Sequence, residues 1–234
     1  MLRETDLGGC SRMQSLLIVV GLRSEARIAA RYGRVAVGPA GLRGALAEQR
    51  PAGLVSFGLC GALDPTLAIG DLLIADAVVI GAERASADES WTAELRARLP
   101  SGRRGDIAAG DAIVGTVAAK AALRRRSGAV AVDMESHAVA LVAARHEIPF
   151  VVLRTVSDSA GHALPRAAQA GFKADGEPDV AAVVTALARR PWELPRLLLT
   201  AANAARALEA LKSAARALTP PPGAGPCGLA GSSP

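Results

Sequence analysis

Short apolar runs alternate with helix-forming segments along most of this chain. Residues 15–20, 53–57 and 149–156 are predicted as buried strands, because short apolar runs between turn signals are typical of strands covered on both faces. Strands that alternate with helices favour an α/β fold with a mixed, mostly parallel central sheet and helices on both faces. A chain of 234 residues, 50% of them hydrophobic, is long enough for one such domain.

The same patterns predict the remaining elements and the domain limits. Further strands are expected at 34–37, 71–80, 106–114 (which includes a turn at 109–111) and 129–132. Helices are expected at 24–31, 89–99, 116–126, 134–146, 178–189 and 192–218, with another that ends at Gln49. The domain should span 15–218, between a disordered extension at 1–14 and a disordered tail at 219–234 that is rich in Pro, Gly and Ser.

Composition excludes several classes of protein. The net charge of +5 favours acidic partners, but the arginines form short clusters without interleaved aromatic residues, so we expect no nucleic-acid partner. Cys10, Cys60 and Cys227 form no CxxC pair, which argues against a disulfide framework and a metal site. No secretory signal is visible, and no apolar run approaches the roughly 20 residues that span a bilayer. We therefore predict a cytoplasmic protein.

Two carboxylates stand where the predicted secondary structure changes. Glu135 lies at the start of a helix that follows the strand 129–132, and Asp158 lies just past the strand 149–156. In an open α/β sheet, ligands bind outside the carboxyl ends of the strands, so we expect both acids to face one cleft. Each acid alone is also compatible with a structural role, as a helix-dipole partner or an N-cap.

The segments around these acids resemble a known family. The matching segments are Phe57–Leu63, Ile69–Leu73, Ala109–Ala112, Ala131–Ser136 and Arg154–Asp158. In this order they are similar to the nucleoside phosphorylase and nucleosidase superfamily, which includes purine nucleoside phosphorylases and methylthioadenosine/adenosylhomocysteine nucleosidases. The resemblance covers 16–190 and implies cleavage of the N-glycosidic bond of a purine nucleoside. It also implies a homo-oligomer.

The resemblance assigns roles to four of these residues. Glu135 would accept hydrogen bonds from the ribose hydroxyls, which strengthen as positive charge develops on the sugar, and Met134 would pack under the ribose. Asp158 would give or share a proton at N7 of the departing purine, and Ser157 would orient it. A carboxyl group that holds a proton near neutral pH needs a raised pKa, which a dry pocket supplies.

The base and nucleophile regions are matched less completely. The backbone at Ile113 and Val114 matches the stretch that binds adenine, although the family often has an aromatic residue there. Gly58, Cys60 and Gly61 belong to a predicted loop beside the nucleophile, where small residues let a ligand approach the backbone. We interpret Cys60 as a small packing residue.

The residue that would activate water is ambiguous. Hydrolases of this family carry a Glu near the first strand-to-helix turn, and the matching position is Ala26, with Glu25 beside it. One residue along a helix rotates a side chain by roughly 100°. Either the alignment slips by one residue, or the base that activates water is absent.

Phosphate is the other candidate nucleophile. Arginine binds phosphate well, and Arg23 and Arg43 lie near the ends of the first two strands, whereas Ser56 and Leu59 stand where many purine phosphorylases have Arg and Ser. We predict phosphorolysis with inorganic phosphate as co-substrate and no other cofactor. The alternatives are a hydrolytic nucleosidase of the methylthioadenosine/adenosylhomocysteine type and a non-catalytic nucleoside-binding protein on the same fold.

The C-terminal part narrows the expected substrate. Together with 21–27 and 60–64, the segment 188–195 resembles the hopanoid-associated phosphorylase subgroup. This resemblance implies that adenosylhopane is cleaved to adenine and a ribosyl hopane in bacterial hopanoid biosynthesis. The helix Pro195–Leu218 mixes leucines with Arg and Lys, which suits contact with the inner face of a membrane. Packing on the domain or on a second subunit is the alternative.

Overall fold

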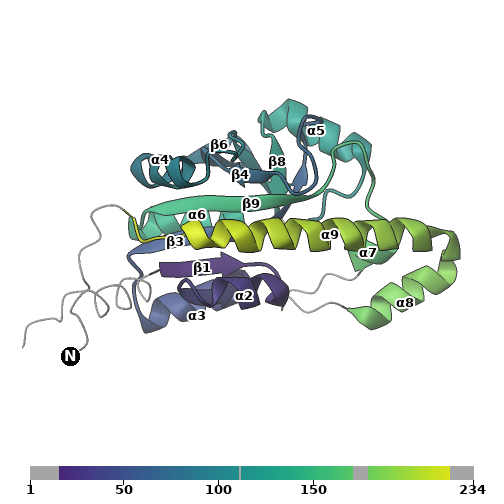
Figure 1. Ribbon diagram of the computed structural model, residues 1–234, viewed down its shortest axis with the longest axis horizontal. Coiled ribbons are helices and arrows are strands. Elements are labelled where there is room, and N and C mark those ends of the chain that lie inside the picture. The colour runs from purple at the N-terminus through teal and green to yellow at the C-terminus, as the bar shows by residue number, and fades with distance from the viewer. Residues whose placement is uncertain (1–15, 111, 171–178, 222–234) are drawn as a thin grey trace, which may run out of the picture.

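The strands of the described residues, 16–110, 112–170 and 179–221, join into one mixed sheet in the computed structural model (Figure 1). They are β1 (Leu16–Val20), β2 (Arg34–Val37), β3 (Gly53–Ala62), β4 (Leu72–Ile74), β5 (Ala77–Ile80), β6 (Glu83–Ser86), β7 (Ile107–Ala109), β8 (Ala131–Asp133) and β9 (Phe150–Asp158). Parallel pairing joins β2, β1, β3 and β9, and also β5, β7 and β8, whereas β3–β8, β4–β9 and β5–β6 are antiparallel. The predicted α/β fold with a mixed, mostly parallel sheet is confirmed.

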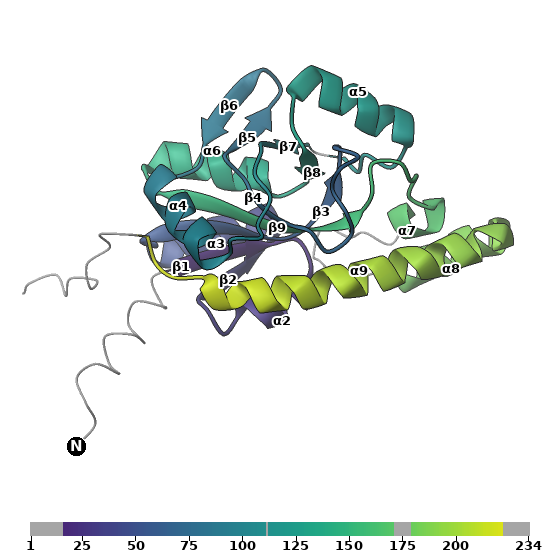
Figure 2. The same ribbon diagram turned by 45° about the horizontal axis from the view of Figure 1, so that its top comes forward.

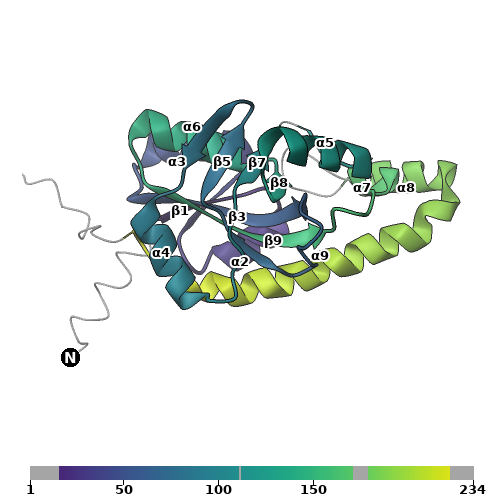
Figure 3. The same ribbon diagram turned by 90° about the horizontal axis from the view of Figure 1, so that it is seen from above.

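Helices cover both faces of this sheet (Figures 2 and 3). They are α2 (Arg23–Ala29), α3 (Gly38–Glu48), α4 (Glu89–Arg98), α5 (Val117–Ser127), α6 (Ser136–His146), α7 (Arg166–Ala170), α8 (Val180–Arg189) and α9 (Leu194–Ala214), with short 3-10 turns η1 (Pro191–Glu193) and η2 (Ala215–Ala217). Alternate residues of β1 serve two cores, as the two-residue period of a strand requires. Leu17 packs in the core that α3 and α6 close, and Leu16 in the core that α2 and α9 close.

Several predicted strand limits shift by a few residues, and the predicted course of two strands is wrong. β3 does not break into a loop at Gly58 but continues to Ala62, because β9 pairs with it as far as Gly61 and β8 pairs with its last two residues. The predicted strand 71–80 is divided into β4 and β5. The first part pairs with β9, and the second pairs with β6 and β7. The pairing between β3 and β9 places Gly58 opposite Arg154 and Gly61 opposite Asp158.

The C-terminal helix lies along the sheet for only part of its length (Figure 1). Ala207, Leu211 and Ala214 are buried against the domain, whereas the first turns of α9 are mostly exposed. After η2, the carbonyl of Thr219 accepts a hydrogen bond from Trp91 Nε1 at 2.9 Å. The predicted extension at 1–14 and positions 222–234 of the predicted tail lie outside the described residues. Within these described ranges, no helix is long and apolar enough to cross a membrane.

Candidate active site

A fully buried arginine organises one end of the site. Arg154 lies on β9, and its guanidinium pairs with Asp133 (Nη2 to Oδ2, 2.6 Å) and with Glu135 (Nη1 to Oε2, 3.2 Å). Its Nη2 also donates to the hydroxyl of Ser56 at 2.7 Å, and this hydroxyl lies 2.8 Å from that of Ser136. A buried guanidinium needs such charged and hydrogen-bonding partners, because an unpaired buried charge is strongly destabilising. Arg154 thereby fixes where the Glu135 carboxylate lies.

Glu135 occupies the junction that its sequence position predicts. It is the N-cap residue of α6 and is separated from the end of β8 by Met134, and its side chain is 20% exposed. Burial raises the pKa of this carboxyl group to about 7; the Arg154 guanidinium opposes the shift, and the charges of Asp133 and Glu25 add to it. Gly21 lies against the carboxylate so closely that a Cβ added there would collide with Oε1. The end of the site that contains Arg154 is therefore formed jointly by residues that follow β1 and β8.

Glu25, and not Ala26, carries its side chain toward these groups. Glu25 is 2% exposed; its Oε2 accepts hydrogen bonds from the backbone N–H groups of Gly21 and Leu22, each at 2.9 Å. Its Oε1 accepts a third from the N–H of Leu59 at 2.8 Å. Burial raises the pKa of Glu25, although Arg154 and these three donors act in the opposite direction. Ala26 packs instead against the core beneath α2 and α9, and α2 begins after Leu22 and not at Ser24 as expected.

The glycine positions of β3 are needed by the protein's own side chains. Gly58 has φ of +150°, and a Cβ added there would lie 2.5 Å from Glu25 Oε1 and 2.7 Å from Arg154 Nη1. At Gly61, an added Cβ would lie 3.0 Å from Asp158 Oδ1. Only glycine combines this backbone freedom with so close an approach. Between them, Cys60 is 3% exposed, and burial raises the pKa of its thiol, as expected for a packing residue rather than a nucleophile.

The other end of the site contains Asp158, the last residue of β9. Its Oδ1 lies 3.4 Å from the Ser157 hydroxyl, which also lies 3.3 Å from the carbonyl oxygen of Cys60. Its Oδ2 forms an ion pair with Nζ of Lys120, on α5. Burial raises the pKa of Asp158, while Lys120 and Ser157 oppose the shift. Cys60 lies on β3 between Gly58, which is opposite Arg154, and Gly61, which is opposite Asp158, so it stands between the two ends of the site.

Two residues of this arrangement were missed by sequence reasoning. Arg154 was matched as part of a motif, but its position in an apolar strand gave no sign of a role. Lys120 is 1% exposed, although lysine in an Arg-rich helix is typical of a solvated surface. Only the packing of α5 beside the end of β9 shows that it contacts Asp158.

The remaining predicted site residues are placed as follows. Met134 is half-buried next to Glu135, and Val114 packs with Leu63 and Val132. Ile113 is half-buried in the same segment, whereas Arg23 and Arg43 are exposed at the surface of α2 and α3.

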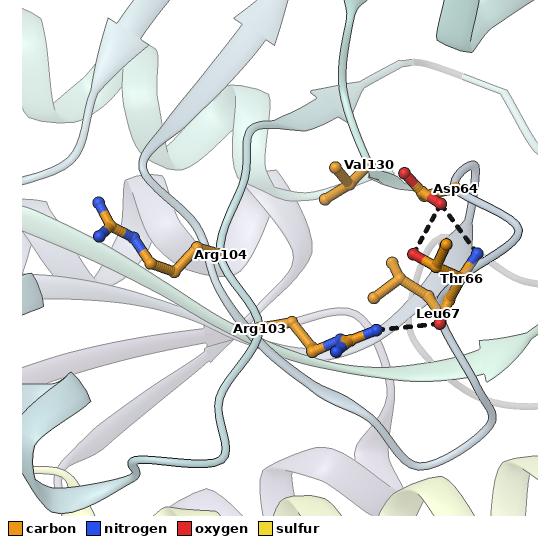
Figure 4. A pocket seen from close by; sticks show the side chains of 6 residues that line it. All are labelled: Asp64, Thr66, Leu67, Arg103, Arg104 and Val130. Carbon is orange, nitrogen blue, oxygen red and sulfur yellow. Dashed lines mark hydrogen bonds between the residues drawn. The ribbon is translucent and has the colours of Figure 1, made fainter.

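The lining of a surface pocket of about 290 Å³ includes neither Glu25, Glu135 nor Asp158 (Figure 4). It is lined by Asp64, Thr66, Leu67, Arg103, Arg104 and Val130. Arg103 Nη2 donates to the carbonyl of Thr66 at 3.0 Å, and the Thr66 hydroxyl donates to Asp64 at 2.8 Å. These bonds brace the loop between β3 and β4, which is a structural role.

The chain is similar to known proteins in sequence and in fold. The family model of the phosphorylase superfamily matches residues 42–189. A 5′-methylthioadenosine/S-adenosylhomocysteine nucleosidase of Marinomonas sp. (strain MWYL1) is 31% identical over 155 residues, which are 56% of this chain and 67% of that protein. The futalosine hydrolase of Streptomyces coelicolor is 34% identical over 127 residues, 46% of this chain and 54% of that protein. The matched segments thus span about half to two thirds of these relatives.

Solved structures extend the likeness of fold over more of the chain. A Helicobacter pylori nucleosidase mutant, solved with 5′-methylthioadenosine in its active site, aligns with a TM-score of 0.60 and 18% identity, covering 88% of this chain and 99% of its own. The native futalosine hydrolase of the same species aligns with a TM-score of 0.58 and 19% identity, with the same coverage.

Proposed function

This chain belongs to the phosphorylase superfamily, and we propose that it is an enzyme that hydrolyses the N-glycosidic bond of an adenosine-type nucleoside. The observation that carries the proposal is the pair of carboxylates, buried Glu25 and partly buried Glu135, beside Arg154 where β1 ends. The two curated relatives named above are a 5′-methylthioadenosine/S-adenosylhomocysteine nucleosidase and a futalosine hydrolase, and both names indicate hydrolysis.

The two ends of the site suit the two halves of a nucleoside. Ionised Glu135 would accept hydrogen bonds from the ribose hydroxyls and would favour the positive charge that develops on the sugar as the bond breaks. Met134 would pack under the ribose. Asp158, with Ser157, would serve the purine, and Ile113 and Val114 would offer it an aliphatic surface and backbone groups.

The charge balance favours water over phosphate as the nucleophile. The carboxyl groups of Glu25, Asp133 and Glu135 surround the single cation Arg154, and the raised pKa values of Glu25 and Glu135 indicate that more negative charge is unfavourable there. Ser56, where a phosphorylase would carry Arg, is buried and already bonded to Arg154 and Ser136. Burial raises the pKa of Glu25, which strengthens its carboxylate as a general base. We therefore propose hydrolysis with Glu25 as the base, in place of the phosphorolysis that we predicted from sequence.

Adenine release tests the proposal. The enzyme would be mixed with 5′-methylthioadenosine and with S-adenosylhomocysteine, with and without phosphate, and free adenine would be measured. We expect release that does not depend on phosphate and that falls by roughly 10²–10⁴-fold in Asp158→Ala. Binding without release would favour the non-catalytic alternative, and release only with phosphate would favour phosphorolysis.

A lipid-linked nucleoside is our proposal for the finer substrate class. The segment from α8 to the first turns of α9 exposes large apolar side chains: Val180, Val184, Trp192, Leu194, Leu198 and Leu199. The exposed Arg189 and Arg196 lie on the same segment. Apolar side chains flanked by cations suit an anionic lipid surface, which supports adenosylhopane as substrate at the inner face of the membrane.

This finer proposal has its own test. Vesicles of anionic lipid should sediment the wild-type protein, and the double substitution Leu198→Glu with Leu199→Glu should weaken sedimentation while cleavage of 5′-methylthioadenosine is retained. Equal sedimentation of both proteins would contradict membrane contact. A change from dimer to monomer in the variant would instead assign this face to a homo-oligomer.

A further inference from the structure

The ammonium group of Lys120 is enclosed by oxygen atoms. Its Nζ pairs with Asp158 Oδ2 and donates to the carbonyl oxygens of Ser159 at 2.7 Å and His162 at 3.2 Å. These are three acceptors for the three hydrogens of a lysine ammonium. This side chain is 1% exposed, so its polar tip must be satisfied by these protein acceptors and not by water.

Asp158 is correspondingly surrounded by donors. The Lys120 ammonium faces Oδ2, the Ser157 hydroxyl lies near Oδ1, and the neutral, buried thiol of Cys60 lies on the adjacent strand. Nδ1 of the His162 ring lies 2.7 Å from the Ser159 hydroxyl, and the backbone carbonyl of His162 accepts a hydrogen bond from Lys120. Burial raises the pKa of Asp158, but the ion pair with the Lys120 ammonium opposes this shift and favours a carboxylate over a carboxylic acid. The proton that a departing purine needs is therefore not stored on Asp158 in the resting pair.

We infer that Lys120 is a positioning residue that stores this proton and supplies it to the base through Asp158. The inference rests on the proposed hydrolysis and adds the source of its acid. It also revises the role expected for Asp158, which becomes the carrier of the proton rather than its store.

The step balances in atoms and charge. The Lys120 ammonium first passes a proton to the Asp158 carboxylate and becomes an amine. The C1′–N9 bond breaks with its electron pair on the purine, and N7 takes this proton from Asp158, which is a carboxylate again. Water adds its hydroxyl group to C1′ and gives its other proton to the Glu25 carboxylate. After the products leave, proton exchange with solvent restores the Lys120 ammonium and the Glu25 carboxylate.

The variant Lys120→Met separates this role from a structural one. Without the ammonium, Asp158 must hold the proton itself, so the alkaline limb of the kcat profile should move to lower pH. We expect kcat for 5′-methylthioadenosine to fall by about 10²-fold or more at alkaline pH and much less at acidic pH, with KM nearly unchanged. A structural defect would lower kcat at every pH and would not move the limb.

A substrate with a good leaving group provides the second measurement. The nitrophenolate of 4-nitrophenyl β-D-ribofuranoside leaves without a proton, so its hydrolysis should be nearly equal in Lys120→Met and wild type. Arg125→Met, on the exposed face of the same helix, is the matched control and should behave as wild type. Lys120→Gln, which keeps a hydrogen-bond donor without the charge, replaces Lys120→Met if the latter does not fold.

The possible outcomes are distinct. An unmoved alkaline limb in both Lys120 variants, or equal losses on the two substrates, would overturn the inference. A wild-type enzyme that cleaves neither substrate would instead refute the proposed function.

Discussion

Arg154 Nη1 lies 3.2 Å from Glu135 Oε2, so a buried guanidinium holds the carboxylate that we assign to the ribose. Replacement of Arg154 by Gln should leave Asp133 buried without its counter-charge and should lower the free energy of unfolding by about 3–5 kcal/mol. Cleavage activity should be lost as well. Urea denaturation checks the first effect, with Arg145→Gln, at an exposed position on α6, as the control. A stable, active Arg154→Gln protein would contradict this account of the site.

Glu25 is the residue on which hydrolysis depends. Because its carboxylate is proposed to take the proton of the attacking water, Glu25→Gln should lower kcat by about 10²–10⁴-fold with little change in KM. Steady-state kinetics of adenine release measure both constants, and Glu83→Gln, at an exposed position on β6, serves as control. Recovery of activity in Glu25→Gln on addition of phosphate would show that phosphate, and not water, attacks.

Activity should depend on pH through the raised pKa values of the acids. Glu135 must be ionised to hold the ribose, and its pKa is raised to about 7 by burial. The pKa of Glu25 is also raised, and Glu25 too must be ionised to act as a base. We therefore expect kcat/KM of the wild type to rise as pH increases through the neutral range. A profile that is flat between pH 5 and pH 8 would show that neither acid titrates there.

Stability should follow pH in the opposite sense. A carboxyl group whose pKa is higher in the folded state than in the unfolded state favours folding below the unfolded pKa, and this contribution is lost as pH rises through the folded pKa. For Glu135 the window runs from 4.5 to about 7. The urea midpoint of wild type relative to Glu135→Gln should therefore fall between pH 5 and pH 8. A difference between the two urea midpoints that does not change with pH would mean that ionisation of Glu135 does not destabilise the folded state.

Gly58 tests the close approach of Glu25 and Arg154 to β3. Gly58→Ala should destabilise the fold by about 1–3 kcal/mol, because the backbone has φ of +150° and the new Cβ would lie 2.5 Å from Glu25 Oε1. Gly44→Ala is a suitable control, since nothing lies within 4 Å of a Cβ at that position on α3 and helices favour alanine. The midpoint of thermal unfolding would be measured for both variants. Equal midpoints in Gly58→Ala and Gly44→Ala would contradict the close approach of Glu25 and Arg154 to β3.

Sequence predicted those parts of the molecule that local patterns determine. The buried strands, most helices and the sheet type followed from apolar periodicity, and the positions of Glu135 and Asp158 at element junctions are as expected. The course of β3 beyond Gly58 could not be predicted, because the glycines signal a turn and only pairing with β9 overrides that signal. The choice between Glu25 and Ala26 likewise needed the actual rotation of α2.

The contacts of Arg154 and Lys120 could not be predicted for a different reason. Their partners lie 19 to 98 residues away in sequence, among them Ser56 for Arg154 and Asp158 for Lys120. Neither basic residue stands three or four positions from its acidic partner, the spacing that predicts an ion pair within a helix. Their roles arise from tertiary packing alone.

The identity of the sugar product tests the central claim most directly. The enzyme would cleave 5′-methylthioadenosine in phosphate buffer, and the sugar would be analysed by mass spectrometry. Attack by water that Glu25 activates predicts free 5-methylthioribose together with adenine. A sugar 1-phosphate, or the absence of any cleavage, would contradict the account.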